Sequence, residues 1–382
     1  MSIKVNINTM NVALFFTYDM SLKKWDETGL IEREILYYNQ LVDKYPINFT
    51  FVTFGDEEDF KYQDKLKNIK IIPIYYLEKR FKNKIARFLF SLFLPFKISK
   101  YLNDIDIYKT NQLLGSWIPI VLKLINRKKL IVRTGYDILT FSIKERRGAF
   151  KIFMYYLLTQ ISLTFSDKYI VTSERDKSFL SNYFLFKKQK IVKINNWVVN
   201  TSYKNIDNRR SNRVLAVGRL ESQKNYAALI KNLENSNLEL DIVGEGSLKS
   251  SLLNLSDEFN VKVNFLGTMD HQKLLDLYYQ YTYYVIFSNF EGHPKSLIES
   301  MSSGCIPIAL DSEYLHEIIV NNFNGVVLQT INENIAEEVI SIENQNDVKA
   351  NLSKNAYEFV KDNYSINKII KKEHSLYIDL IG

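Results

Sequence analysis

The feature that most constrains the fold is an alternation of short apolar segments with amphipathic helical segments, which runs along the chain twice. In the first series, the apolar, β-rich segments are Asn11–Tyr18, Asn48–Phe54, Ile69–Ile74, Asp106–Thr110, Lys129–Arg133 and Lys168–Thr172. Between the first two of them, Gly29–Lys44 places its apolar side chains at helical spacing. Strands that alternate with helices in this way predict a parallel sheet with helices on both faces.

The pattern begins again after Tyr203–Asn212, a polar stretch without apolar periodicity. The strands of the second series are predicted at Arg213–Val217, Glu239–Val243, Val261–Leu266, Tyr283–Ser288 and Cys305–Leu310. A chain of 382 residues suits two domains of roughly 150–200 residues each. We predict two doubly wound α/β domains facing each other across a cleft, with ligands beyond the carboxyl ends of the strands. The expected boundaries are a first domain over 1–203, a linker over 204–212, a second domain over 213–364, and a last helical segment over 365–382 that returns to the first domain.

The composition excludes several classes of protein. Hydrophobic residues make up 46% of the chain and charged residues 24%, which are globular values rather than disordered ones. The single cysteine, Cys305, excludes an intramolecular disulfide and a cysteine-based zinc site, and it fits a reducing compartment. No stretch reaches the ~18–20 uncharged apolar residues of a membrane span. The N-terminus resembles a strand more than a signal peptide, so a cytoplasmic location is expected.

The segment Ser288–Leu310 is the most informative one for chemistry. A predicted strand ends at Ser288, a loop carries Glu291, and Pro294 stands at the first turn of a predicted helix. Such a helix start presents free backbone N–H groups and the positive end of the helix dipole, which together bind anions. Glu299 lies a little over one turn inside the helix and can face the same ligand. An ordinary strand–turn–helix with solvated glutamates is the alternative.

A second segment, Val214–Asn225, carries two cations after a strand. Gly218 allows a tight turn at the strand end, and Arg219 and Lys224 then flank the same crevice. Two fixed positive charges and a helix N-terminus are what a diphosphate leaving group needs when no metal is present. Taken singly, each cation is equally typical of an ordinary surface turn.

Together these segments resemble the retaining glycosyltransferases of family 4, which have the GT-B fold. The family's G-R-L…K-N segment corresponds to Gly218-Arg219-Leu220 and Lys224-Asn225, and its two glutamates with seven residues between them correspond to Glu291 and Glu299. Further segments that resemble the family are Ile242–Gly246, Phe265–Gly267, Ser303–Pro307 and the interdomain segment Asn195–Asn200.

The resemblance implies a UDP- or GDP-sugar donor as co-substrate, transfer with retention, and neither a metal ion nor another cofactor. Arg219 and Lys224 would bind the diphosphate, Glu299 the ribose hydroxyls and Glu291 the sugar. The implied catalytic residues are Glu291, Arg219 and Lys224. The other implied donor-binding residues are Gly218, Gly244, Gly267, Met269, Gly292, His293, Pro294, Lys295, Ser296 and Leu297. His293 stands where the family usually has an apolar residue, which affects the expected contacts to the donor sugar.

The first half of the chain resembles the family more loosely. Gly29 is expected where many members have a glycine pair that lets a phosphate approach. Arg133 and Tyr136 follow a strand and are expected either to meet the acceptor or sugar or to form a structural turn. An acidic pair, Asp104 and Asp106, resembles the metal-binding pair of another glycosyltransferase class, but it stands at the amino end of its strand. Ligands bind at the other end, so no metal site is expected.

The charge of the chain is unevenly distributed. Residues 1–204 hold 34 Lys and Arg against 19 Asp and Glu, a net charge of +15, and the remainder has a net charge of −8. The segment 79–100 has seven Lys or Arg, no acid and a middle of Phe and Leu, and 144–156 repeats the combination. This pattern predicts shallow insertion into an anionic membrane surface. A core helix whose lysines reach outwards is the alternative.

The resemblance to family 4, together with the composition, implies a bacterial hexosyltransferase-type enzyme of surface polysaccharide biosynthesis, for lipopolysaccharide or capsule. It would act on a glycan or lipid-linked acceptor, peripherally on the inner face of the plasma membrane. A sugar-nucleotide 2-epimerase on the same fold stays open, although a chain poor in histidine and cysteine offers few proton-transfer groups. A nucleic-acid-binding protein is disfavoured because the basic residues alternate with aliphatic runs and no nucleic-acid motif appears.

Overall fold

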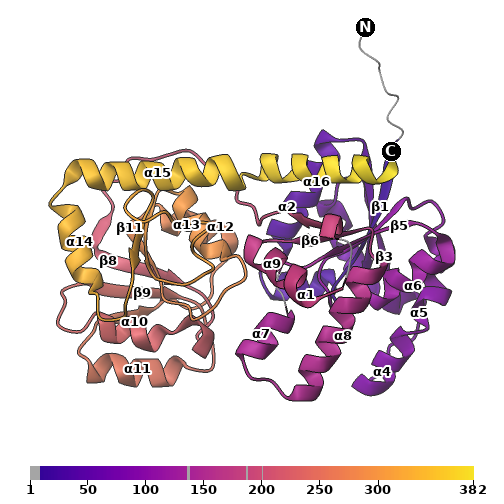
Figure 1. Cartoon of the computed structure of the whole chain (residues 1–382), viewed down its shortest axis with the longest axis horizontal. Coiled ribbons are helices and arrows are strands. Elements are labelled where there is room, and N and C mark those ends of the chain that lie inside the picture. The colour runs from indigo at the N-terminus through magenta and orange to yellow at the C-terminus, as the bar shows by residue number, and fades with distance from the viewer. Residues whose placement is uncertain (1–8, 136–137, 186–187, 200) are drawn as a thin grey trace, which may run out of the picture. The chain divides into compact units, whose positions relative to one another are not determined.

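Seven parallel strands form the sheet of the first unit, in the spatial order β3-β2-β1-β4-β5-β6-β7 (Figure 1). The computed structural model describes residues 9–135, 138–185, 188–199 and 201–382. The strands are β1 (Met10–Phe15), β2 (Ile47–Thr53), β3 (Ile69–Pro73), β4 (Ile107–Thr110), β5 (Lys129–Arg133), β6 (Lys168–Val171) and β7 (Ile191–Lys193). The strand order reverses between β1 and β4, and this switch point is where open α/β sheets bind ligands.

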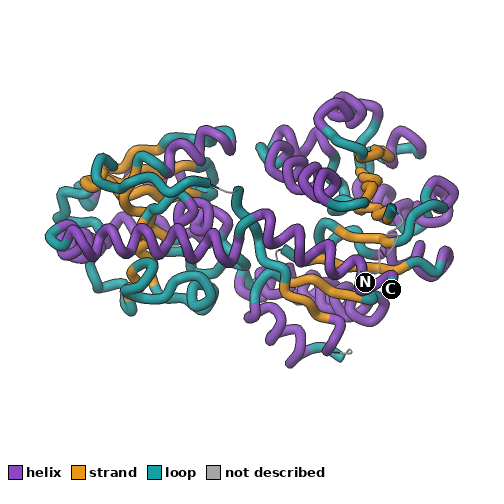
Figure 2. Tube along the Cα trace, turned by 90° about the horizontal axis from the view of Figure 1, so that it is seen from above, coloured by secondary structure: helices purple, strands orange, loops and turns teal. Residues whose placement is uncertain are grey.

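Helices and short 3₁₀ turns connect these strands (Figure 2). The helices are α1 (Leu22–Glu27), α2 (Ile31–Lys44), α3 (Ile74–Leu77), α4 (Lys84–Ser91), α5 (Leu94–Ile98), α6 (Trp117–Asn126), α7 (Ile138–Lys144), α8 (Ala149–Phe165) and α9 (Glu174–Tyr183). The 3₁₀ turns are η1 (Glu57–Lys65), η2 (Ser99–Tyr101) and η3 (Lys188–Lys190). None of the helices in the described part of the chain has both the length and the apolar character that crossing a bilayer requires.

The second unit has a six-stranded parallel sheet in the order β10-β9-β8-β11-β12-β13. Its strands are β8 (Arg210–Val217), β9 (Glu239–Val243), β10 (Val263–Phe265), β11 (Tyr281–Ile286), β12 (Ile306–Leu310) and β13 (Val326–Leu328). Its connections are η4 (Ser222–Lys224), α10 (Tyr226–Asn232), α11 (Lys249–Glu258), α12 (His271–Tyr278), α13 (Lys295–Ser302), α14 (Ile335–Glu343) and α15 (Asn346–Tyr364). The switch point of this sheet lies between β8 and β11. The prediction of two doubly wound α/β domains is confirmed.

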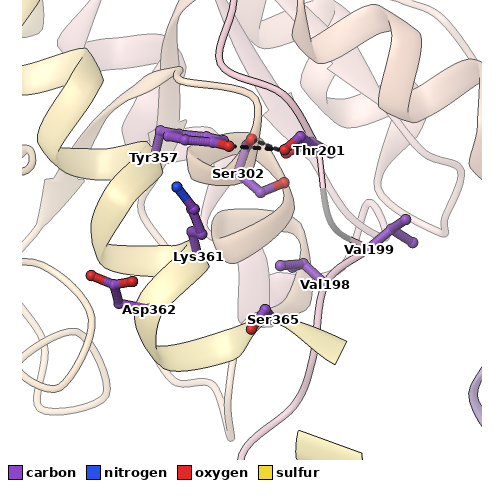
Figure 3. A pocket seen from close by; sticks show the side chains of 8 residues that line it. All are labelled: Val198, Val199, Thr201, Ser302, Tyr357, Lys361, Asp362 and Ser365. Carbon is purple, nitrogen blue, oxygen red and sulfur yellow. Dashed lines mark hydrogen bonds between the residues drawn. The ribbon is translucent and has the colours of Figure 1, made fainter. Parts of the chain in front are cut away.

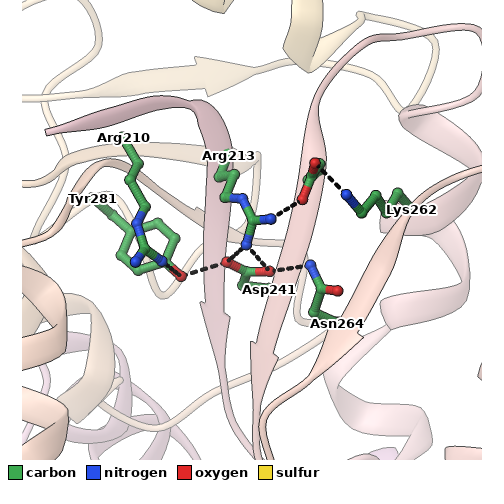
Figure 4. A network of polar contacts seen from close by, with 7 residues as sticks. Arg210, Arg213, Asp241, Lys262, Asn264 and Tyr281 are labelled. Atoms are coloured by element: carbon green, nitrogen blue, oxygen red, sulfur yellow. Dashed lines mark hydrogen bonds and ion pairs between the residues drawn. The ribbon is translucent and has the colours of Figure 1, made fainter.

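A buried carboxylate ties four strands together at the amino ends of the second sheet (Figure 4). Asp241 on β9 accepts hydrogen bonds from Asn264 Nδ2 at 2.6 Å, from the Tyr281 hydroxyl, and from Arg213 Nη1 at 3.1 Å. Burial and the bond to Asp241 raise the pKa of Tyr281 to about 12. The polar side chains at this end of the sheet therefore bond to one another and have a structural role. Ligands are expected at the other end, in the loops after the carboxyl ends of the strands.

The division between the units lies earlier in the chain than the predicted linker. One unit extends to Ile194 and takes up Ile370–Gly382, and the other is Asn195–Ile369. Within the predicted linker, Ile206 is buried in the core of the second unit, and Arg210–Asn212 already belong to β8. The packing of this segment was not predicted because its composition is polar and a single isoleucine, Ile206, enters the core.

The last helix, α16 (Ile366–Ile381), belongs to the first unit from Ile370 onwards, where a buried charge network holds it. Glu373 forms an ion pair with Lys109 and accepts hydrogen bonds from the hydroxyls of Tyr37, at 2.6 Å, and Tyr377. Arg133 Nη1 lies 3.4 Å from the same carboxylate. Burial alone would raise the pKa of Glu373. The charges of Lys109 and Arg133 lower the pKa by more than burial raises it, so the pKa is about 2. The carboxylate is therefore charged, and its partners fix the helix.

Candidate functional site

The loops that follow β8 and β11 meet at the switch point of the second sheet. Lys224 Nζ lies 2.6 Å from Glu291 Oε1, and both side chains are partly buried. The backbone supports this pairing, because Asn289 N–H donates to the Gln223 carbonyl and Gln223 Nε2 donates to the Phe290 carbonyl, each at 2.9 Å. The two predicted segments are therefore brought together as one structural unit around a cation and a carboxylate.

Two glycines let the turns of this edge stack closely. A Cβ atom on Gly244 would lie 2.0 Å from the Gly218 carbonyl oxygen, so the turns after β8 and β9 could not approach with any side chain there. A Cβ atom on Gly218 would lie 2.4 Å from Lys224 Cε. Gly244 N–H also donates to the Gly267 carbonyl at 2.8 Å, which adds the turn after β10 to the stack.

Helix α13 begins at Lys295, after Pro294, and no side chain caps its first turn. Its first turn also contains no acidic residue, so the backbone N–H groups and the positive end of the dipole suit an anion. Ser296 accepts a hydrogen bond from the Tyr284 hydroxyl at 2.8 Å. Leu297 is fully buried in the core, so only its backbone is suited to a ligand contact.

Glu299 lies one turn further along α13 and is buried. His271, the first residue of α12, places its Nε2 atom 3.2 Å from Glu299 Oε1. The histidine thus holds the carboxylate that the resemblance assigns to the donor ribose. His271 was not predicted as a site residue. Its position directly after the loop 267–270, which carries the predicted donor residues Gly267 and Met269, could have indicated it.

Four other predicted donor residues are buried or partly buried in the second unit. The His293 ring packs edge-on against Tyr364, with the ring centroids 5.1 Å apart, and the His293 carbonyl accepts a hydrogen bond from Asn196 Nδ2 at 3.0 Å. Gly292 and Pro294 are buried, and Met269 packs against an apolar cluster of the same unit. Arg219, by contrast, is exposed, and its guanidinium makes no ion pair with any described residue.

In the first unit, Gly29 has a structural role at a helix end, and its expected contact with a phosphate stays a prediction. It ends α1 in a left-handed conformation, with φ +69°, and two hydrogen bonds complete a Schellman C-cap. Gly29 N–H donates to the Asp26 carbonyl at 2.9 Å, and Leu30 N–H donates to the Trp25 carbonyl at 2.8 Å. The glycine that permits close approach at the β1/β4 switch point is Gly115, where a Cβ atom would lie 3.1 Å from Tyr18 N.

Arg133, for which either a contact to the acceptor or sugar or a structural turn is expected, makes a structural contact, and the sugar contact stays a prediction. Its side chain is largely buried and faces Glu373 of α16. Tyr136, predicted beside it, lies outside the described residues. Asp106 accepts a hydrogen bond from Asn11 N–H at 2.9 Å, at the amino end of the first sheet. No cluster of three potential metal ligands occurs in the described ranges.

A cavity of about 390 Å³ lies elsewhere in the second unit (Figure 3). It is bordered by Thr201, whose hydroxyl donates to the Ser302 carbonyl, and by Tyr357, whose hydroxyl donates to the Thr201 carbonyl at 2.9 Å. Ser302 is the last residue of α13, where the helix dipole is negative. Lys361 and Asp362, with opposite charges, also line this cavity, so it has no net positive lining for a diphosphate, and the loops of the β8/β11 switch point remain the candidate site.

The part of the chain that holds the candidate site is similar to known proteins. Residues 201–359 match the family model described as glycosyl transferases group 1. The amylovoran biosynthesis glycosyltransferase AmsD of Erwinia amylovora is 28% identical over 253 residues, which are 64% of this chain and 69% of that protein.

A second relative is the N-acetylgalactosamine-N,N'-diacetylbacillosaminyl-diphospho-undecaprenol 4-alpha-N-acetylgalactosaminyltransferase of Campylobacter jejuni. It is 34% identical over 130 residues, and the match covers 32% of this chain and 34% of that protein. The chain thus spans 69% of the first relative and about a third of the second.

Among solved structures, sucrose-phosphate synthase from Thermosynechococcus elongatus has the same fold. It superposes with a TM-score of 0.78 at 17% identity, over 97% of this chain and 99% of that chain. The chain therefore has the GT-B fold, and its residues 201–359 are similar to the glycosyl transferases group 1 family.

Proposed function

We propose that this protein is a glycosyltransferase that moves a sugar from a nucleotide-diphosphate sugar to a glycan acceptor. The observation that carries the proposal is the pairing of Lys224 with Glu291 at the β8/β11 switch point, next to the uncapped start of α13. The leaving diphosphate develops negative charge as the bond to the sugar breaks. A fixed cation and backbone N–H groups stabilise that charge without reorganisation at the moment of reaction.

Each residue has a distinct role in this proposal. Lys224 exchanges its contact with Glu291 for a phosphate oxygen, and the exposed Arg219 turns onto the same diphosphate. Glu291 then faces the donor sugar. Glu299 accepts hydrogen bonds from the ribose hydroxyls, and His271 positions it by holding one of its carboxylate oxygens.

We further propose that transfer proceeds with retention and without a metal ion. The resemblance to family 4 supports retention. The supply of positive charge by Lys224, Arg219 and the start of α13 supports metal independence. Activity should therefore survive EDTA, measured with and without added Mn²⁺. Complete loss in EDTA that Mn²⁺ reverses would contradict this part of the proposal.

The acceptor we propose is a lipid-linked glycan of bacterial surface polysaccharide biosynthesis, such as lipopolysaccharide or capsule, met at the inner face of the plasma membrane. Two relatives support this choice by their names alone. One acts in amylovoran biosynthesis, and the other is named for a diphospho-undecaprenol-linked acceptor.

The test combines binding and product analysis. UDP, GDP and ADP at 100 times their dissociation constants would each add ~2.7 kcal/mol to the stability of a protein that binds them, visible as a thermal shift. We expect UDP or GDP to stabilise the chain. The matching nucleotide sugar is then incubated with a diphospho-undecaprenol-linked glycan, and the anomeric configuration of the product is read by NMR. A 2-epimerised nucleotide sugar without transfer would assign the alternative activity, and the absence of any nucleotide effect would reject the site.

A further inference from the structure

Helix α8 in the first unit exposes an unusual number of apolar side chains, in addition to Ile152, Tyr155 and Leu158, which pack against the core. Its buried residues are Thr159, Ser162 and Leu163, two of which carry hydroxyl groups. Its exposed side includes Phe150, which is 77% exposed, and Phe153, which is 59% exposed. The other exposed apolar residues of the helix are Met154, Tyr156, Leu157, Ile161 and Phe165. Surface helices normally turn their apolar stripe to the core and their polar face to water.

Helix α4 and the start of α5 also expose many apolar side chains. The only buried residue of α4 is Ser91, and Asn83 caps the helix by accepting hydrogen bonds from the N–H groups of Ile85 and Ala86. The exposed apolar residues of this stretch are Ile85, Phe88, Leu89, Leu92, Phe93 and Phe96, of which Ile85 is 71% and Phe96 66% exposed. Ile85, Phe88 and Leu89 thus belong to a well-formed helix, Leu92 and Phe93 to the turn after it, and Phe96 to α5.

Helix α6 packs against both of these helices and fixes them as parts of one surface. Ser116, which precedes α6, lies 2.9 Å from Ser162 of α8, hydroxyl oxygen to hydroxyl oxygen. Trp117, the first residue of α6, donates through Nε1 to Ser91 Oγ of α4 at 3.1 Å. Figure 1 shows α4 and α8 extending from the same side of the first unit. We name the exposed residues of 82–96 and 150–165 the α4–α8 surface.

The α4–α8 surface is bordered by cations. Lys82, Lys84 and Lys151 are exposed, and none of them forms an ion pair with a described residue. Arg87 is not among these cations, because its side chain is only 11% exposed and lies 3.0 Å from Asp19. The border therefore carries positive charge that the protein itself leaves unneutralised.

We propose that the α4–α8 surface docks on an anionic lipid bilayer, with its phenylalanines in the boundary between headgroups and acyl chains and its lysines at the headgroups. Apolar side chains bordered by lysines match that boundary. A second copy of the chain would bring like charges together, and nucleic acid would leave the phenylalanines exposed. Docking as such is independent of the proposed transfer, whereas its use, to reach a lipid-linked acceptor, rests on the proposed function.

Sedimentation with phosphatidylglycerol vesicles, without donor or acceptor, tests the docking. Each lysine near an anionic surface raises the vesicle partition coefficient about fivefold. The partition coefficient of the Lys82→Glu/Lys84→Glu/Lys151→Glu variant should therefore be lower than that of the wild type by at least about 100-fold. The matched control is Lys65→Glu/Lys70→Glu/Lys371→Glu, which changes exposed lysines of the same unit by the same charge and should bind like the wild type. Salt at 1 M should remove the electrostatic part.

A second pair of variants isolates the apolar part. Phe150→Ser/Phe153→Ser should weaken binding at every salt concentration, whereas Phe323→Ser/Ile340→Ser, at exposed positions of the second unit, should not. Circular dichroism verifies that each variant is folded. Wild-type protein that ignores phosphatidylglycerol vesicles at low salt would overturn the proposal. A concentration-dependent dimer that only Phe150→Ser/Phe153→Ser dissociates would overturn it too, by assigning the surface to a second copy. Vesicle binding without any transfer activity would reject only the proposed function.

Discussion

At the turn after β8, the absence of a side chain determines where Lys224 can lie. In Gly218→Ala, the new Cβ atom would lie 2.4 Å from Lys224 Cε, a flexible methylene that can move away. We expect the protein to stay folded while kcat/KM for transfer falls about tenfold, or ~1.4 kcal/mol, because the cation is displaced from the diphosphate. Gly244→Ala should behave differently, since its Cβ atom meets a backbone oxygen at 2.0 Å. It should lower the free energy of unfolding by about 1–3 kcal/mol in urea titrations. Equal stability of the two variants would contradict this explanation.

The ligand contacts themselves are tested by Lys224→Ala and Glu299→Gln. Each removes a proposed donor interaction worth about 2–4 kcal/mol in a site shielded from water. We expect kcat/KM to fall by the corresponding factor, with thermal stability in the absence of nucleotide nearly unchanged. Lys249→Ala is the control, because Lys249 is an exposed lysine of the same unit that pairs only with Glu245 at 2.9 Å. Wild-type turnover in both test variants would reject the site.

At the scale of single elements, α16 depends on one carboxylate. In Glu373→Gln, Lys109 and Arg133 stay buried without a negative partner, which should cost about 3–5 kcal/mol of stability. The control is Asp379→Asn, an exposed acid on the same helix. Because Lys109 and Arg133 outweigh the effect of burial, the pKa of Glu373 is about 2 in the folded protein, against an ordinary value of 4.5. Its stabilising contribution is therefore complete above pH 4.5 and is lost as the pH falls towards 2.

This loss of stability can be measured as the decrease in the urea unfolding midpoint as the pH is lowered from 6 to the lowest pH at which the protein folds. The wild type and Asp379→Asn should lose stability more steeply below pH 4.5 than Glu373→Gln does. Parallel pH profiles in all three proteins would mean that Glu373 is not charged in the folded state.

Much of the element pattern was predictable from sequence, and the exceptions have physical reasons. Buried parallel strands form continuous apolar runs, so the inner strands were found within a few residues of their bounds. The strands β7 and β13, of three residues each, were missed, whereas the equally short β10 was found because it lies within a longer apolar run. In the site, glycine and charge spacing identified Gly218, Lys224 and Glu291. His271 and Glu373 were missed because their partners lie 28 and 264 residues away, which only the folded chain brings together.

At the scale of the whole molecule, the two units differ in how much of the chain they need. The second unit is one continuous segment, Asn195–Ile369, with its own apolar cores. The first unit needs residues from both ends of the sequence, because Lys109 of β4 is paired with Glu373 of α16. We therefore expect a fragment of residues 195–369 to fold alone and to bind the same nucleotide as the whole chain.

The shorter fragment 213–364, which follows the boundaries expected from sequence, should be less stable than 195–369. It lacks the buried Ile206 and the backbone bridge between Val198 and Ser365. A fragment of residues 1–194 should be destabilised by about 3–5 kcal/mol, because its buried Lys109 has lost Glu373. Joining residues 370–382 to it through a flexible linker should restore that stability, and joining the same segment with Glu373→Gln should not. The test is urea unfolding of these three polypeptides, followed by circular dichroism, with the unfolding midpoints compared. If 1–194 unfolds at the same midpoint with and without the added helix, the buried pair does not hold the first unit together.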